Sequence, residues 1–220
     1  GMAEAFGIFA NDGMAVGTHR IRKLVDREGR VLMRNISPLD PHATTSDTLI
    51  ALTHWWTPPE TRIPQDVAFV MKANLAEVVK RGTAKAARKH PLAVAGKTGT
   101  LPFDVWFVGF SPYRSSAVWI GADRRERWLG LSRKKSKVYG STAALPAWLD
   151  FMAQVEKGKD KTPLTKPIPD GITYVNVDPV TGLKSRGDGR SIPHRRGTAP
   201  TEYAPEEDDI DQILDLETEF

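Results

Sequence analysis

Three β-rich runs follow one another in the middle of the chain, with only short links between them. They extend over residues 92–100, 104–110 and 115–122, and the links contain Pro102 and Ser111-Pro112. Links of so few residues can join antiparallel strands, whereas parallel strands need a crossover of a dozen residues or more. The spacing therefore predicts an antiparallel meander in the order of the chain.

Two segments on either side of these runs have apolar residues at the helical period. In residues 64–81, Pro64 suits the first helical position and Gly82 the end. The second segment, residues 142–155, has a hydroxyl residue at its start and tolerates a proline in its first turn. Both helices are expected to cover one face of the sheet, which gives an α+β fold.

Two shorter elements are predicted closer to the N-terminus. Apolar residues at positions i, i+4 and i+7 from Met2 predict a short amphipathic helix that ends by Gly13. A polar turn at residues 26–29 lies between two apolar runs and predicts a hairpin. Residues 35–63 are rich in Pro, Thr, Ser and Asp and are expected to form an irregular connection.

The aromatic side chains are expected to be structural. Core packing is the prediction for Trp106, Phe107, Trp119 and Trp148, which lie on the predicted strands and the second helix. For Trp55 and Trp56 packing under a loop is favoured over a binding lip.

The composition changes after residue 155. Residues 156–220 are rich in Pro and Gly, and their one strand candidate is 172–177. A Gly/Arg run at 186–197 and the acidic end are predicted to lack regular structure. The expected organisation is therefore a folded unit at 2–155 and an extension at 156–220 with a disordered acidic end.

Charge is distributed unevenly along the chain. From Glu202 onward there are nine acidic residues and no Lys or Arg, while the remainder has 31 basic and 18 acidic residues, a net charge of +13. The pattern predicts a basic body with a solvated acidic tail. The basic cluster at 124–137 is expected to be a solvated loop, and no recognised nucleic-acid-binding motif accompanies it, so nucleic acid is not an expected partner.

Several classes of function are disfavoured by what the sequence lacks. It contains no cysteine, and its five histidines are scattered, so neither a metal nor another cofactor is expected. No stretch approaches the roughly 18 apolar residues of a membrane-spanning helix, and the N-terminus lacks the pattern of a secretory signal. The chain as given is expected to be soluble.

The most informative motif is Lys97-Thr98-Gly99-Thr100, which lies on the first β-rich run. The triplet alone recurs by chance, but its context is specific. The succession from Met2 to about Met152 resembles the C-terminal part of the transpeptidase domain of class A penicillin-binding proteins. The matching stretches, besides the three β-rich runs, are Met2–Gly13, Val25–Leu32, Val79–Ala84 and Ala143–Trp148, in the order of that family.

The resemblance implies acyl transfer, in which a serine attacks a D-alanyl-D-alanine stem peptide or a penicillin. It implies that Lys97 is the catalytic wall lysine and that the Thr98 and Thr100 hydroxyls bind the substrate carboxylate. The backbone N–H of Thr100 would be one of two oxyanion donors, and Gly99 would let the substrate lie along the strand edge. The link between Thr100 and Asp104 is shorter than is usual in the family.

The family places Ser-x-x-Lys and Ser-x-Asn motifs ahead of Lys-Thr-Gly. Here the only Ser-x-x-Lys begins at Ser132, in the cationic loop, and a Tyr-x-Asn variant begins at Tyr174, which is expected to lie on a short edge strand. Both follow Lys97. The chain is therefore expected to lack the nucleophile and to be inactive alone, with the N-terminal half of the domain as a partner.

Three hypotheses remain open from the sequence. The chain is part of an active synthase whose parent protein is anchored at the periplasmic face of the inner membrane. Alternatively, it is a truncated, non-catalytic module for binding or complementation. The remote third hypothesis is a basic nucleic-acid-binding protein with an acidic tail.

Overall fold

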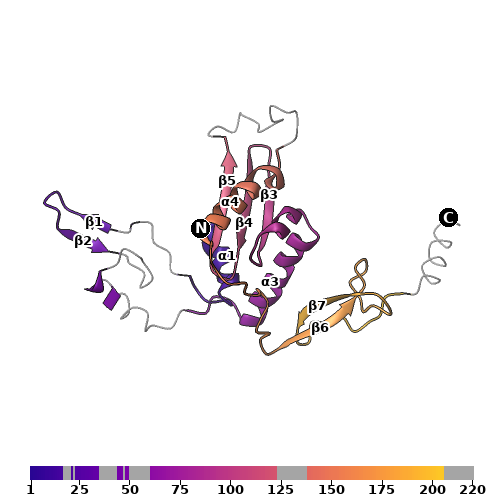
Figure 1. The fold of residues 1–220 in the computed structure, drawn as a ribbon. Helices are drawn as coiled ribbons and strands as arrows, with labels where there is room; N and C mark the ends of the chain where they lie inside the picture. Colours follow the sequence, from indigo (N-terminus) through magenta and orange to yellow (C-terminus); the bar gives the residue numbers. More distant parts are fainter. Residues whose placement is uncertain are drawn as a thin grey trace.

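The structure is a computed structural model, and it describes residues 1–16, 21, 23–34, 44–46, 48–49, 60–122 and 138–205. At its centre lies a three-stranded antiparallel sheet of β3 (Ala95–Thr100), β4 (Asp104–Phe110) and β5 (Ser115–Gly121), in that order (Figure 1). Its register places Gly99 opposite Trp106 and Trp106 opposite Trp119. The predicted meander is confirmed.

Both long helices form close to their predicted bounds. They are α3 (Gln65–Lys80) and α4 (Leu145–Val155), and a short π-helical turn, Gly140–Ala144, leads into α4. Trp148 of α4 is fully buried and packs edge-on against Phe107 of β4, with 5.0 Å between ring centroids. Both residues belong to the larger apolar core.

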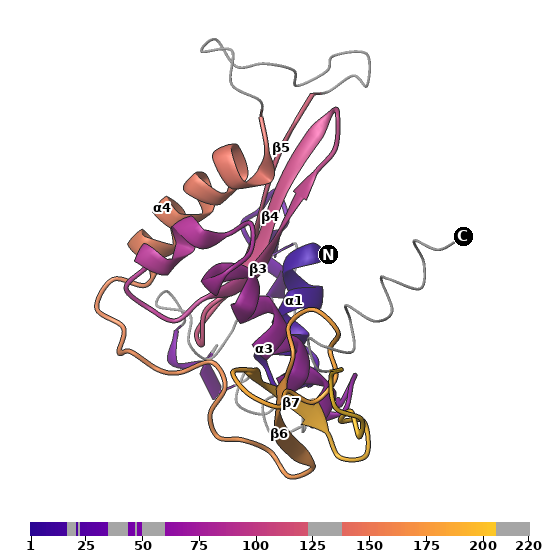
Figure 2. The same cartoon turned by 90° about the vertical axis from the view of Figure 1, so that its right-hand side faces the viewer.

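The helices 64–81 and 142–155 were expected to cover one face of the sheet together, but only α4 does so: α3 lies beside β3 and contributes to the cores on both faces. A third helix covers the face opposite α4. On one face, the Trp148 indole N–H of α4 donates a hydrogen bond to the Ser116 carbonyl at 3.1 Å. On the other, α1 (Met2–Ala10) accepts a hydrogen bond at the Ala3 carbonyl from the Ser115 hydroxyl, at 2.7 Å. Figure 2 shows α4 and α1 on opposite sides of the strands.

The reason is the composition of β4. Its alternate side chains are apolar on both faces, with Phe107 directed to one core and Phe110 to the other, and both are fully buried. Helix α3 lies beside β3 and contributes to both cores, with Leu75 near Phe110 and Val79 in the Phe107 core.

Not every predicted core aromatic is buried. Phe107 and Trp148 are, whereas Trp106 is half-buried and Trp119 has 48% of its surface exposed. Helix α1 covers the opposite end of that face, near Ser115, so the indole of Trp119 lies in solvent and tilts against Trp106. The core prediction for Trp119 was wrong.

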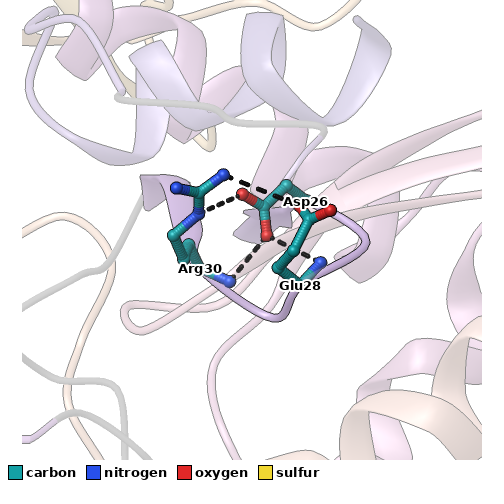
Figure 3. Close-up of polar contacts among 3 residues, drawn as sticks. All are labelled: Asp26, Glu28 and Arg30. Carbon is teal, nitrogen blue, oxygen red and sulfur yellow. Dashed lines mark hydrogen bonds and ion pairs between the residues drawn. The ribbon is translucent and has the colours of Figure 1, made fainter.

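The predicted N-terminal hairpin is present as β1 (Lys23–Val25) and β2 (Val31–Arg34). The carboxylate of Asp26 closes its turn by accepting hydrogen bonds from the backbone N–H groups of Glu28 and Arg30 at 3.0 and 2.8 Å, and from Arg30 Nε at 2.7 Å (Figure 3). Partial desolvation raises the pKa of Asp26, but these hydrogen bonds together hold it below its ordinary value.

The predicted strand at 172–177 is β6 (Ile172–Val177), and its partner is β7 (Arg190–Arg195). The prediction that the Gly/Arg run has no regular structure was therefore wrong. Arg195 Nε donates a hydrogen bond to Asp66 of α3 at 2.7 Å, and Pro193 is buried, so contacts outside the run stabilise it. Residues 202–205 also lie against this hairpin, through backbone hydrogen bonds to Lys184.

Some predictions fall outside the described residues: Trp55 and Trp56, the basic loop at 124–137 with Ser132, and the acidic end from residue 206. The division of the chain at residue 155 stays a proposal. Among the described residues, no helix is both long and apolar enough to cross a membrane.

Candidate functional site

The open edge of β3 carries the Lys-Thr-Gly motif. One side of β3 pairs with β4, and no described strand pairs with the other. The Leu101 N–H donates to the Asp104 carbonyl at 2.8 Å and closes the turn between the strands. Because backbone groups alternate in direction along an antiparallel strand, the N–H and C=O groups of Thr98 and Thr100 point to the open edge.

The ammonium of Lys97 lies at the same edge. Its Nζ donates a hydrogen bond to the Thr98 carbonyl at 2.9 Å, and the side chain is exposed. The backbone of Lys97 faces β4, so the flexible side chain and not the main chain brings the positive charge to the edge. This arrangement provides a cation beside two outward-facing backbone N–H groups.

The two threonine side chains share the face that α4 covers. Thr98 Oγ1 lies 2.6 Å from Thr83 Oγ1, in the loop that follows α3. Thr100 Oγ1 accepts a hydrogen bond from the Gly140 N–H at 3.1 Å. Both hydroxyls are therefore oriented by protein groups, and both border the open edge.

Glycines allow neighbouring segments to approach β3 closely. A Cβ added to Gly96 would lie 2.6 Å from the Val108 carbonyl oxygen and 2.7 Å from the Phe107 ring. A Cβ on Gly140 would lie 2.6 Å from the Gly99 carbonyl oxygen. Such distances are too short for any real side chain, so the sheet and the start of the π-helical turn pack backbone against backbone.

All four predicted site residues, Lys97, Thr98, Gly99 and Thr100, lie together on this edge strand. Sequence reasoning missed two of their neighbours, Thr83 and Gly140. The only sequence signal for Thr83 was its position directly after Gly82, at the end of a predicted helix. An exposed polar residue is common at such a position, so it did not indicate a site. Tyr174 and Asn176 lie on β6, opposite Pro193 and Ser191, as expected for a short strand.

A metal site has no support in the described part of the chain. None of its His, Asp and Glu side chains form a group of three or more that could hold a metal ion. The site consists of one lysine, hydroxyl groups and backbone donors, a set that suits an anion or a peptide strand better than a cation.

Comparison with curated proteins finds several relatives. The chain is 35% identical over 180 residues to penicillin-binding protein 1A of Aquifex aeolicus, and the aligned region covers 81% of this chain and 21% of the relative. It is 31% identical over 214 aligned residues to penicillin-binding protein 1A of Pseudomonas aeruginosa, and this alignment covers 82% of this chain and 25% of the relative. The chain thus spans about a fifth to a quarter of the length of these relatives. No family model matches it.

Solved structures share the fold. Penicillin-binding protein 1A from Haemophilus influenzae superimposes with a TM-score of 0.69 at 24% identity, over 93% of this chain and 32% of that one. The PonA1 protein from Mycobacterium tuberculosis in complex with penicillin V gives a TM-score of 0.53 at 27% identity, over 74% of this chain and 39% of that one. The α+β fold class predicted from the sequence is confirmed.

Proposed function

We propose, from its homology to penicillin-binding protein 1A over about four fifths of its length, that this chain forms the substrate-binding wall of a peptidoglycan transpeptidase site. The observation that carries the proposal is the open edge of β3, where Lys97, Thr98 and Thr100 present a cation, hydroxyl groups and backbone donors. A peptide can add to such an edge as a further strand.

The chemistry of the edge suits a peptide that ends in a carboxylate, such as a D-alanyl-D-alanine stem peptide, or a β-lactam. The Lys97 ammonium attracts the carboxylate, and the hydroxyls of Thr98 and Thr100 donate hydrogen bonds to it. The N–H of Thr100 points to the edge, where it can stabilise the oxyanion that forms during acyl transfer. Gly99 adds no side chain between these groups.

Acyl transfer also needs a nucleophile, a base and a second oxyanion donor. We assign these to the N-terminal half of a transpeptidase domain, which makes that half the protein partner of this chain. The same assignment puts the parent protein at the periplasmic face of the inner membrane. The same assignment of groups holds for the alternative hypothesis, in which this chain is a separate module that complements such a half.

The test uses a fluorescent penicillin and an N-terminal half of the domain that carries Ser-x-x-Lys, added in trans to residues 1–220. We expect covalent label on the added half, with a rate that increases when the chain is present. Lys97→Ala should reduce that increase at least tenfold, because the carboxylate loses its charge partner.

The matched control is Lys166→Ala, which removes an exposed lysine from the extension and should leave labelling unchanged. The proposal fails if the chain does not change the labelling of the added half, or if Lys97→Ala and Lys166→Ala behave alike.

A further inference from the structure

A contact between two hydroxyl groups joins the substrate strand to the loop after α3. Thr83 Oγ1 and Thr98 Oγ1 are 2.6 Å apart, although fifteen residues separate them in the sequence. Thr83 is exposed and Thr98 half-buried, so the pair lies at the surface beside the open edge of β3. No part of the family resemblance assigns a role to Thr83.

The backbone holds Thr83 in place from both sides. A Cβ on Gly82 would lie 2.9 Å from the backbone of Val78, so only glycine lets the chain turn back against the last turn of α3. On the other side, Ala84 is fully buried and its N–H donates to the Val78 carbonyl at 3.3 Å. The loop that presents the Thr83 hydroxyl to Thr98 is thus held against the last turn of α3.

The number of protons in the pair limits what it can do. Each hydroxyl has one proton, and the contact between the two oxygens uses one of them. The second proton is left for another acceptor. When an anion accepts the proton of Thr98, the Thr98 oxygen must accept from Thr83, and a hydroxyl that accepts a hydrogen bond becomes a stronger donor.

We propose that Thr83 is a positioning residue of the substrate strand, which donates to Thr98 and so directs the Thr98 proton to the terminal carboxylate of a bound peptide. The inference rests on the proposed function, because it requires a peptide along β3. The proposed site then includes the loop after α3, and the contact with Thr83 gives the hydroxyl of Thr98 at the surface a preferred direction.

The test compares two ligands that differ only at the end that the hydroxyl would contact. Isotope-labelled chain is titrated by NMR with an N-acetylated D-alanyl-D-alanine and with its C-terminal carboxamide. The wild type should prefer the carboxylate. In Thr83→Val, which keeps the shape and removes the hydroxyl, we expect that preference to fall roughly tenfold, since a hydrogen bond to a charged group is affected.

Two further variants separate positioning from simple structural support. Thr83→Ser restores the hydroxyl and should recover the preference, and Thr173→Val on β6 should leave it unchanged. If Thr83→Val weakens both ligands equally, the residue only supports the fold and the inference is wrong. If the wild type prefers the carboxylate and Thr83→Val keeps that preference, the inference alone fails. If neither ligand binds the wild type, the proposed function fails with it.

Discussion

The hydroxyl of Ser111 donates a hydrogen bond to the carboxylate of Glu156 inside the protein, and so connects the turn after β4 to the end of α4. Ser111 is fully buried, and Glu156 has 4% of its surface exposed. The same hydroxyl oxygen accepts hydrogen bonds from the backbone N–H groups of Tyr113 and Arg114. The Ser111 hydroxyl thus joins the turn before β5 to the Glu156 carboxylate.

Removing this carboxylate should destabilise the chain. Glu156→Ala leaves the Ser111 hydroxyl without its acceptor in a buried place, and we expect a loss of about 1–3 kcal/mol of unfolding free energy. Glu156→Gln keeps an acceptor oxygen and should lose less. Urea unfolding measures both, with Asp150→Ala as a control on the exposed face of the same helix. Equal stabilities for Glu156→Ala and Asp150→Ala would show that the contact is unimportant.

Gly140 should not tolerate even one methyl group. Its added Cβ would lie 2.5 Å from the Trp106 carbonyl oxygen on β4 and 2.6 Å from the Gly99 carbonyl oxygen on β3, so Gly140→Ala must push the π-helical turn away from the sheet. We expect a loss of roughly 1–3 kcal/mol in urea unfolding and a weaker hydrogen bond to Thr100. Gly187→Ala is the matched control, because its Cβ would meet nothing within 4 Å. A stable Gly140→Ala variant would mean that the turn can move without cost.

The ion pair between Asp66 and Arg195 should make the docking of the β6–β7 hairpin depend on pH. The hydrogen bond from Arg195 is the main reason that the pKa of Asp66 lies below its ordinary value. A carboxyl with a depressed pKa in the folded state stabilises that state at pH values above its unfolded pKa. This contribution disappears as the pH falls through the lower, folded-state pKa.

We therefore expect the Arg195 side-chain N–H signal in NMR to be constant from pH 7 to about pH 4 and to change below it. In Asp66→Asn the signal should have its acid value already at pH 7, whereas Asp188→Asn, at an exposed site, should behave as wild type. A wild-type signal that is unchanged down to pH 2 would contradict the assignment.

A labelled penicillin should not acylate a polypeptide of residues 1–220 on its own. Positioning and electrostatic stabilisation can act without a nucleophile, but a covalent acyl-enzyme needs a serine and a base to take its proton. The chain is incubated with a fluorescent penicillin, denatured and examined for covalent label. Strong label that disappears in Ser132→Ala would instead identify a rearranged active site in the basic loop.

Local pattern was sufficient for the elements that carry the motif. Short links between β-rich runs allow only antiparallel pairing, so the meander followed from residues 92–122 alone. The period of apolar residues and the positions of Pro64 and Gly82 similarly determined α3. These features depend on neighbours in the sequence, and the order of Lys97, Thr98 and Gly99 along the edge follows directly from them.

Contacts between distant segments were decided only by the tertiary structure. The Gly/Arg run becomes β7 because β6 pairs with it and Asp66 binds Arg195, and neither partner is visible in the run itself. Trp119 is exposed because α1 covers the other end of its face. Likewise Thr83 reaches Thr98 only after α3 has packed beside β3. Sequence periodicity indicates which side of a helix or strand is apolar. Which other element packs against that side depends on contacts between residues far apart in the sequence.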